Sequence, residues 1–422
     1  MLPVLGVSID FASGASFAYP LILDDPVYGH LNEQVLADQP ADIVDITNQV
    51  MKVSTRRGRN RILANFEAGT ATVTLNDPDS WFDPYNSSSP YYGKLLPLRK
   101  IRIWADTPFE GSTVRIYLFS GYITSYDTNF FQGTNATATV TLQCVDGFRL
   151  LNNVSTGLAP IAGAYVGQFT GNRVQDILTV AGFPASMRAI EQGDSTLQMD
   201  PGGARSALAA IQTVEQSEFG AFYMSRQGEA KFLSRNTVSQ LADVSARNFS
   251  DTGAAGTQLY NSLDFAYDDQ LILNDVTVTR LGGVPQEVTD AQSISTYFIK
   301  SGQRSDILVQ TDKEANDQAR MLLVARKNAD LRIDSMNLNI AGQTDENDIV
   351  VNLTADIYTL INITKTMPGG SLVTRELFIQ GVQHDVTPTT WNTKFLTAEP
   401  IIQAFILSSS TQGILNNNTL SY

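Results

Sequence analysis

Few side chains in this sequence could act as nucleophiles or metal ligands. The 422 residues include one cysteine, Cys144, and two histidines, His30 and His384. A zinc site or a Cys–His or Ser–His–Asp constellation needs several such groups, so this chain has too few to build one. Cys144 lies at an alternating apolar position in "VTLQCVDGF", which indicates a buried small hydrophobe rather than a nucleophile. We therefore predict no catalytic residue, no cofactor and no metal.

Acidic clusters and a glycine-containing run are the remaining candidates for ligand binding. Asp24-Asp25 and "GQTDENDIV", with Asp345, Glu346 and Asp348, could offer oxygen ligands to calcium. Neither cluster has the alternating ligands and the turn glycine of a calcium loop, so we interpret both as solvated acidic loops. "GLAPIAGAYVGQFTG" lacks the Lys and Ser/Thr spacing of a phosphate loop.

The net charge of −14 argues against stable nucleic-acid binding, because a phosphate-binding surface is basic. The one basic cluster, "STRRGRNR", contains Arg56, Arg57, Arg59 and Arg61. We interpret it as a basic turn that meets acidic loops in this chain or in a neighbour, with phosphate binding as the lesser alternative. No apolar run approaches the ~20 residues of a membrane helix, and the N-terminus lacks a signal-peptide pattern. We therefore expect no membrane span and assembly in a cytoplasm.

Most of the sequence alternates apolar and polar residues with a period of two, which is typical of half-buried antiparallel strands. In Ala71–Leu75 every second residue is apolar and the threonines face the other side. The alternation recurs in Lys100–Ala105, in "VRIYLF" and in "ATATVTLQC".

The middle of the chain changes to helical spacing. "NRVQDILTVAGF" predicts a helix that Asn172 caps and Gly182 ends. A second helix carries its apolar stripe at Ala207, Leu208, Ile211 and Val214. "AFYMSRQGEAKFLSR" predicts a hairpin that turns at Gln227-Gly228. Together these elements indicate a compact α+β insert.

These patterns predict a mainly β fold with an α+β insert. The expected domains are an N-terminal β-barrel at 1–154, a peripheral α+β domain at 155–258, a second β-barrel at 259–402, and a polar C-terminal tail at 403–422. The second β domain is expected to contain one helix, opened by the capping box Thr311–Glu314. The inner face of this helix carries Ala315, Ala319, Leu322 and Leu323. Strands are expected around this helix, including "DIVVNLTA".

The two β-rich parts share a pattern that suggests an internal duplication. The segments beginning at Leu96 and at Ile357 each have a strand, a Pro/Gly turn, and a second strand that reaches Leu-Phe. A glycine soon follows, Gly121 in one and Gly381 in the other. We predict two small antiparallel β-barrels or sandwiches that bend at these glycines. The alternative is that strands joined by turns simply look alike.

An aromatic loop follows the strand at Ala71. "NDPDSWFDPYN" ends that strand, because Pro78 lacks the N–H that a ladder needs. The aromatic residues of the loop are Trp81, Phe82, Tyr85, Tyr91 and Tyr92. With Arg57 and Arg59 they are our candidate assembly contacts, because aromatic loops are enriched at protein interfaces. Two alternatives remain open: the rings cover the end of their own barrel, or they bind sugar beside Asp77, Asp79 and Asp83.

Several of these segments resemble minor tail proteins of bacteriophages, specifically the baseplate or tail-tip hub family. "VSTRRGRNRILANFEAGTATVTLNDPDSWFDPYNSSSPYYGKLLPLRKIRIWA" is similar to the N-terminal part of that family. "LNDVTVTRLGGVPQEVTDAQS" and "EANDQARMLLVAR" are similar to its C-terminal half. The resemblance runs from about residue 48 to residue 397, and its motifs are structural rather than catalytic.

The resemblance implies a non-enzymatic structural virion protein with two tube-forming β domains. Such a hub is a homotrimer with pseudo-sixfold symmetry that joins a hexameric tail tube or distal-tail ring to a threefold tip. It lines the channel through which DNA is ejected. Expected partners are further copies of the chain, distal-tail or tail-tube proteins, and tip or fibre proteins. The alternatives are a hexameric distal-tail ring protein, or a tail-associated cell-wall hydrolase or carbohydrate-binding protein.

Overall fold

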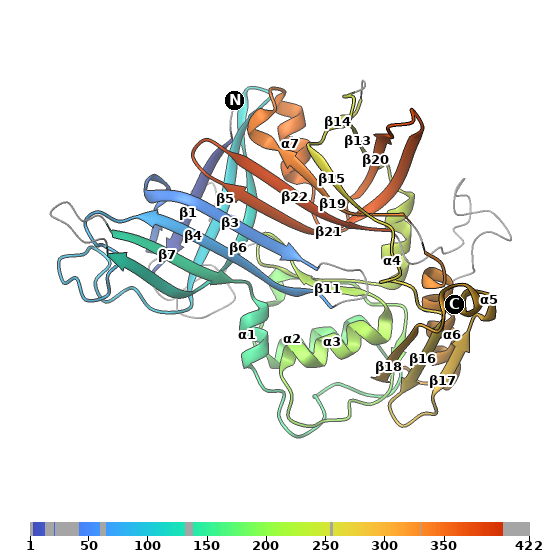
Figure 1. The fold of residues 1–422 in the computed structure, drawn as a ribbon. Coiled ribbons are helices and arrows are strands. Elements are labelled where there is room, and N and C mark those ends of the chain that lie inside the picture. Colours follow the sequence, from blue (N-terminus) through green and yellow to red (C-terminus); the bar gives the residue numbers. More distant parts are fainter. Residues whose placement is uncertain are drawn as a thin grey trace.

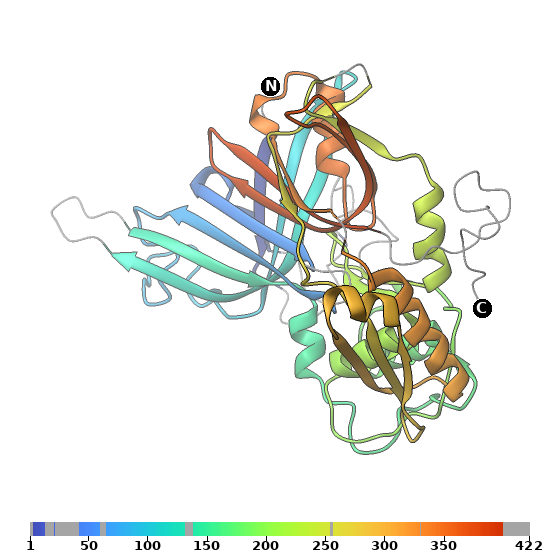
Figure 2. The same ribbon diagram turned by 45° about the vertical axis from the view of Figure 1, so that its right-hand side comes forward.

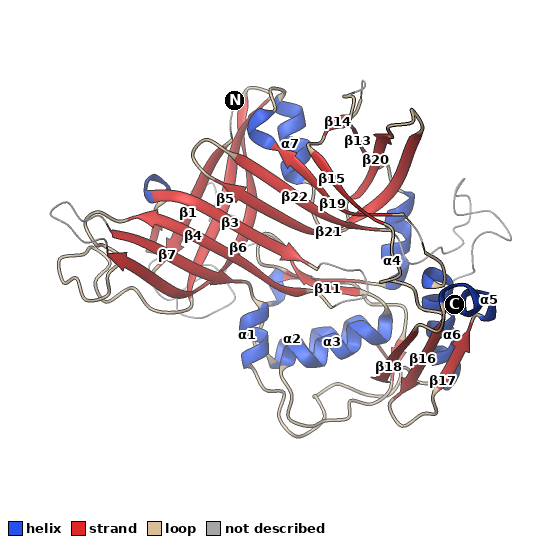
Figure 3. Ribbon diagram, in the orientation of Figure 1, coloured by secondary structure: helices blue, strands red, loops and turns tan. Residues whose placement is uncertain are grey.

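Strands dominate the fold, as the sequence predicts. The computed structural model describes residues 3–12, 21, 42–59, 65–130, 138–253, 256–329 and 331–399. Strands fill the upper part of the molecule, and most of the helices lie beneath them (Figure 1, Figure 3). Fourteen of the strands in the described part form one continuous sheet. The protein is therefore mainly β with α+β elements.

The N-terminal part of the large sheet, here called the first unit, has seven strands. They are β1 (Val4–Asp10), β2 (Ile43–Asp45), β3 (Val50–Gly58), β4 (Glu67–Asn76), β5 (Arg99–Phe109), β6 (Ser112–Phe130) and β7 (Ala138–Val145). Alternate residues of β7, and of β4 from Gly69 onward, are buried as predicted. In β5 the prediction of a half-buried strand is wrong, because Lys100, Arg102 and Trp104 are buried as well as Ile101 and Ile103. Both faces of β5 are therefore covered.

The C-terminal part of the large sheet, here called the second unit, also has seven strands. They are β13 (Arg247–Ser250), β14 (Gln258–Leu259), β15 (Ser262–Ala266), β19 (Arg332–Asn339), β20 (Leu360–Thr366), β21 (Leu372–Val386) and β22 (Trp391–Ala398). The two units join where β21 pairs antiparallel with β3. Blue and cyan strands therefore lie beside red ones in Figure 1.

The two units repeat one topology. In space the first unit runs β3-β4-β7-β6-β5-β1-β2, and the second runs β15-β19-β22-β21-β20-β13-β14. Numbered along the chain within each unit, both have the strand order 3-4-7-6-5-1-2. One strand differs in direction: β1 is antiparallel to β5, whereas β13 is parallel to β20. The duplication is thus present as a repeated strand order.

The match of Gly121 with Gly381 is wrong by four residues. The pairing of β6 with β7 skips Thr124, and the pairing of β21 with β22 skips Gln380. Superimposing these two bulges places Gly381 at the position of Ser125. The shared Leu-Phe pairs misled the comparison, because a bulge shifts the register without a sequence signal of its own.

Most of the α+β insert lies below the large sheet in Figures 1 and 2, and α4 lies beside the sheet. It contains α1 (Phe148–Asn153), α2 (Thr170–Val180), α3 (Ala207–Glu218), α4 (Arg235–Gln240), β8 (Gln168–Phe169), β9 (Arg188–Ile190), β10 (Thr196–Leu197), β11 (Ala221–Met224) and β12 (Ala230–Leu233). Helix α2 ends before Gly182, whose φ is +73°, as predicted. It starts two residues before Asn172, however, so Asn172 is not its cap. Helix α3 is capped by Ser206, which accepts from the Ala209 N–H.

A second insertion separates β15 from β19. It contains β16 (Asp275–Arg280), β17 (Gln286–Thr289), α5 (Ala291–Tyr297), β18 (Ser301–Ile307) and α6 (Asp312–Arg326). The predicted capping box opens α6, with Thr311 and Glu314 each bonding the other's backbone. The predicted inner face of α6 is buried. Strands β16, β17 and β18 form a sheet of their own, so this stretch does not extend the second β unit as expected.

Helix α7 (Glu346–Thr354) occupies the segment that was expected to be a strand. Asp345 caps it by accepting from the Asn347 N–H, and Glu346 and Asp348 fall in its first turn. Acidic residues are favourable at that end of a helix dipole. The short apolar run "IVV" did not distinguish a strand from a helix. The acidic cluster is therefore a helix start and not a free loop.

The strand pairing does not follow the predicted boundary at residue 258. Strand β13 belongs to the large sheet although it precedes that boundary. One hydrophobic core contains residues of both units, for example Val73 and Leu142 of the first unit and Met336 and Ile379 of the second. A second core joins the α+β insert to Leu360 at the start of β20 and to Phe378 in the middle of β21. The predicted tail at 403–422 lies outside the described residues.

Candidate functional site

The junction between the two units is a close approach of backbones. Gly58 of β3 lies opposite Gly381 of β21. Its φ is +104°, and a Cβ built there would lie 2.2 Å from the Gln380 carbonyl oxygen and 2.4 Å from the Gly381 Cα. The Arg59 N–H donates to that same carbonyl at 2.9 Å. Only glycine fits here, because any side chain would force the two strands apart.

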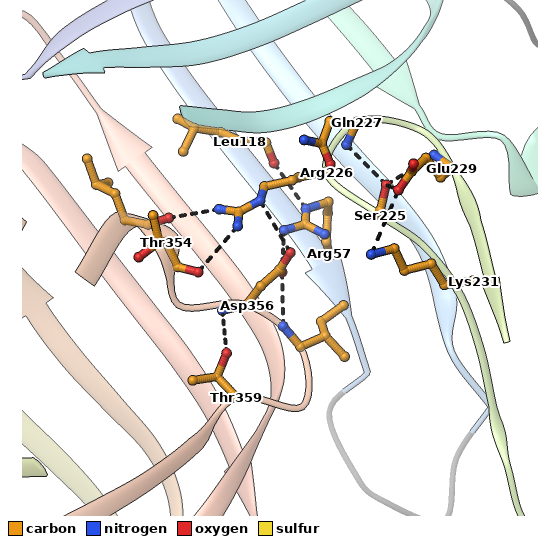
Figure 4. Close-up of polar contacts among 12 residues, drawn as sticks. Arg57, Leu118, Ser225, Arg226, Gln227, Glu229, Lys231, Thr354, Asp356 and Thr359 are labelled. Atoms are coloured by element: carbon orange, nitrogen blue, oxygen red, sulfur yellow. Dashed lines mark hydrogen bonds and ion pairs between the residues drawn. The ribbon is translucent and has the colours of Figure 1, made fainter. Parts of the chain in front are cut away.

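The Arg57 side chain connects β3 to two other segments at this junction. Its Nε donates to the Leu118 carbonyl of β6 at 3.0 Å. Its Nη2 lies 2.6 Å from Oδ1 of Asp356, in the loop between α7 and β20 (Figure 4). The Arg57 side chain is only 5% exposed, and that of Asp356 is 22% exposed. The predicted basic turn therefore meets an acidic loop of its own chain.

The α+β insert adds a second arginine to this cluster. Arg226 lies in the turn between β11 and β12, and its Nε is 3.6 Å from Oδ2 of Asp356. Its guanidinium also donates to the carbonyls of Leu353 and Thr354, at 3.1 and 3.3 Å. Ser120 of β6 donates its hydroxyl to the Arg226 carbonyl at 2.9 Å. The hairpin tip thereby ties the insert to both units.

The hairpin that carries Arg226 is held by local bonds. The Ser225 hydroxyl accepts from the N–H groups of Gln227 and Glu229, at 3.3 and 3.1 Å (Figure 4). Gly228, with φ +88°, supplies the left-handed residue that the turn requires. Lys231 lies 3.8 Å from the Glu229 carboxylate. The predicted turn at Gln227-Gly228 is confirmed, and it presents Arg226 to Asp356.

Charge holds this cluster together. Burial raises the pKa of the Asp356 carboxyl, but Arg57, Arg226 and the Ile357 N–H outweigh burial. The net pKa of Asp356 is lower than its ordinary value. Asp356 therefore stays ionised, and its stabilising contribution is present above the unfolded pKa and lost as the pH falls.

His384 of β21 is buried beside the same charges. Its Nδ1 lies 2.9 Å from the Thr393 hydroxyl, and its ring meets Trp391 edge to face. Burial, helped by Arg57 and Arg226 and opposed by Asp356, lowers the pKa of His384 to about 3. The imidazole is therefore neutral at pH 7, and it is packed inside the sheet.

We expect the pH dependence of stability to change in His384→Gln. The pKa of His384 is lower in the folded state than in the unfolded chain, so below about pH 6.5 the unfolded chain binds a proton that the folded protein does not. The folded protein therefore loses stability as the pH falls below that value. The wild type should lose about 2 kcal/mol of unfolding free energy relative to the variant between pH 7 and pH 5. Urea unfolding of both proteins at pH 7, 6 and 5 measures this difference. A difference that is constant with pH would contradict the neutral, buried imidazole.

Comparing the wild type with His384→Gln also cancels the pH dependence of stability that comes from other buried groups. Burial raises the pKa values of Asp146 and of Glu215 to about 7, so both groups favour the folded state at lower pH. They are present in both proteins and cancel in the difference.

The Arg59 side chain is buried at the junction and bonds to residues of the second unit. Its Nε donates to Gln380 Oε1 at 2.9 Å, and its Nη2 donates to the Tyr358 hydroxyl at 2.8 Å. Its guanidinium lies over the Phe66 ring, 4.4 Å from the centroid. Arg57 and Arg59, both candidate assembly contacts, thus bond within the chain in this structure. Arg61 lies outside the described residues.

The aromatic loop divides into buried and exposed rings. Phe82 and Tyr91 are 0% and 8% exposed, and the half-buried Trp81 packs against the same core. The buried carboxylate of Asp77 accepts from the N–H groups of Trp81 and Phe82, at 2.8 and 2.9 Å. These rings pack against the core, and their loop lies between β4 and β5 in the chain, as α7 lies between β19 and β20.

Tyr85 and Tyr92 are different, because they are 93% and 55% exposed. They are the two predicted contacts whose side chains are mostly exposed. Asp77 is committed to the loop backbone, which removes one of the three acidic residues named for sugar binding.

The structure brings Arg57 and Arg59 together at the junction and leaves the aromatic loop elsewhere. Sequence reasoning missed Asp356 and Arg226, which complete the cluster from positions far along the chain. A buried Arg needs an acidic partner, but nothing in the sequence said which one.

Ligand-binding groups are sparse in the described part of the chain. No group of three or more His, Cys, Asp or Glu side chains there could hold a metal ion. No helix among those residues is long and apolar enough to cross a membrane. His30 and Asp24-Asp25 lie outside the described residues.

The fold has relatives among solved structures. The tail protein from Neisseria meningitidis MC58 is similar with a TM-score of 0.58 and 10% identity, over 94% of this chain and 97% of that one. The 43 kDa tail protein of prophage MuSo2 from Shewanella oneidensis is similar with a TM-score of 0.54 and 10% identity, over 85% of this chain and 94% of that one. No family model and no curated protein matches the sequence. The chain therefore has the fold of these tail proteins.

Proposed function

We propose that this chain is the hub of a phage tail tip: a structural, non-enzymatic protein of the virion, assembled in the host cytoplasm. In this proposal three copies form a homotrimer with pseudo-sixfold symmetry. The ring joins a hexameric tail tube or distal-tail ring to the threefold tip and its fibre or tip proteins. DNA leaves through the channel that the ring encloses.

The repeated seven-strand topology carries this proposal. A threefold ring offers six near-equivalent positions only if each subunit holds two equivalent units. The similarity to two tail proteins over most of each chain supports the same conclusion. The net charge of −14 also suits a channel wall that repels the phosphate backbone rather than binding it.

The exposed rings of Tyr85 and Tyr92 are the proposed contacts with a neighbouring tail protein. They project from the loop whose other rings are packed against the first unit. Exposed tyrosines supply large contact area with little entropic cost.

The mass of the full chain in solution tests the trimer. We expect multi-angle light scattering to give three times the 46.0 kDa of the chain, in a concentration-dependent equilibrium with monomer. A particle of six copies would favour the distal-tail ring instead. A protein that stays monomeric at every concentration, also after mixing with its neighbouring tail proteins, would contradict the hub.

A further inference from the structure

We propose that copies of this chain join edge to edge, with the free edge of β6 in one copy pairing with the free edge of β15 in the next. The proposal rests on the trimer proposed above and names the surfaces that would form it. Its basis is the internal repeat, which shows one such junction within the chain, between β21 and β3.

The repeat is close enough to transfer residue positions between units. Leu98 and Tyr358, which precede β5 and β20, both have φ near +65°. Their N–H groups donate to the carbonyls of Ile123 and Ile379, at 2.6 and 2.7 Å. The bulges at Thr124 and Gln380 follow one residue later in each unit. β6 and β21 therefore correspond residue by residue beyond this point.

The corresponding stretches differ in what pairs with them. Residues 381–386 of β21 pair with β22 on one edge and with β3 on the other. Residues 125–129 of β6 pair with β7 on one edge. In the described part of the chain no strand pairs with their other edge, because β5 ends its pairing at Ile123. β6 thus has a free edge at the place where β21 holds β3.

β15 is the counterpart of β3. Ser54 pairs through Thr72 to Gln143, and Asp264 pairs through Ser335 to Leu396. Gln143 and Leu396 are equivalent, because each pairs with the residue that follows the bulge in β6 or β21. Asp264 of β15 therefore has the position that Ser54 has in β3. Within the described residues β15 pairs with β19 alone, so the edge that β3 uses for β21 is free in β15.

The free edge of β15 has exposed apolar side chains. Phe265 is 37% exposed, and Tyr267, just after the strand, is 70% exposed. Neither 125–129 nor 262–267 contains lysine or proline, which natural edge strands use to prevent pairing. Both edges therefore remain competent to pair, and strand addition would cover the two rings.

The β21–β3 register predicts the intermolecular one. Asp385 pairs with Ser54, and Gln383 with Arg56. Asp385 and Ser54 correspond to Asn129 and Asp264, so we expect Asn129 opposite Asp264. Two residues along each strand, Asp127 is expected opposite Ala266. The Arg59 N–H donates to the Gln380 carbonyl, and alternation from that bond along the ladder makes both of these pairs non-hydrogen-bonded. Cβ atoms are closest in such pairs, which suits a disulfide.

Four cysteine substitutions provide both the test and its control. Asp127→Cys with Ala266→Cys, and Asn129→Cys with Asp264→Cys, match the predicted register. Asp127→Cys with Asp264→Cys, and Asn129→Cys with Ala266→Cys, use the same four sites displaced by two residues. The native Cys144 is buried, and burial raises the pKa of its thiol, so it should not compete. Each full-length variant is oxidised at a concentration where light scattering detects the oligomer.

We expect the matched pairs to run as covalent dimers and trimers on a non-reducing gel and to return to monomer with reductant. The mismatched pairs should stay mostly monomeric on the same gel, although light scattering shows them assembled. An assembled trimer in which matched and mismatched pairs cross-link equally, or not at all, would overturn the edge pairing and leave the proposed hub intact. A wild-type chain that never assembles would instead refute the proposed hub.

Discussion

Replacing Gly58 with alanine is expected to destabilise the protein by at least about 3 kcal/mol. The new Cβ would collide with backbone atoms of Gln380 and Gly381, 2.2 and 2.4 Å away. The φ of +104° would be strained for any L-residue in addition. Backbone atoms cannot rotate away as a side chain does, so the two units must separate at β3 and β21. Chemical unfolding of the variant and the wild type measures the loss.

Gly111→Ala is the matched control for that experiment. Gly111 lies in the turn between β5 and β6, with a φ of +78° and no atom within 4 Å of a built Cβ. Its substitution carries the cost of the positive φ alone, about 1 kcal/mol. If both substitutions cost the same, the contact between the two units at Gly58 is not a constraint on the fold.

Asp356→Ala should cost about 3–5 kcal/mol, because it leaves buried Arg57 without its counter-ion. Arg57 is 5% exposed, and Arg226, which also faces Asp356, is 21% exposed. Since Asp356 joins the second unit to β3 and to the α+β insert, we expect the insert to open together with the junction. Unfolding followed separately by tryptophan fluorescence and by circular dichroism measures both the loss and its cooperativity.

Asp269→Ala is the corresponding control on the surface. Asp269 pairs with Lys300, and these side chains are 61% and 36% exposed. An exposed ion pair contributes little to stability, because water and salt screen it. A loss for Asp356→Ala that is no larger than this control would mean that the Arg57 cluster does not hold the units together.

Local patterns predicted the elements whose signal lies within a few residues. The capping box at Thr311 and Glu314 located the start of α6, and Gly228 located the hairpin turn. The alternation in β7 predicted its buried face, because each side chain there meets one core. Helix α7 was missed, because an apolar run as short as "IVV" fits a strand and a helix equally well.

Contacts between residues far apart in the chain could not be predicted from the sequence. Arg57 was singled out by its charge, but Asp356 and Arg226 reach it only through the fold. The register of the repeat was missed for a related reason. A bulge at Thr124 or Gln380 is visible only in strand pairing, and Leu-Phe pairs gave a more obvious but false alignment.

An averaged electron-microscopy view of the assembled protein along its axis tests the central claim most directly. That claim is that one chain supplies two equivalent β units, so that three chains present six. The account predicts six similar strand-rich densities around the axis, with three copies of the α+β insert outside them. An average with three strand-rich densities, or with six copies of the insert, would contradict it.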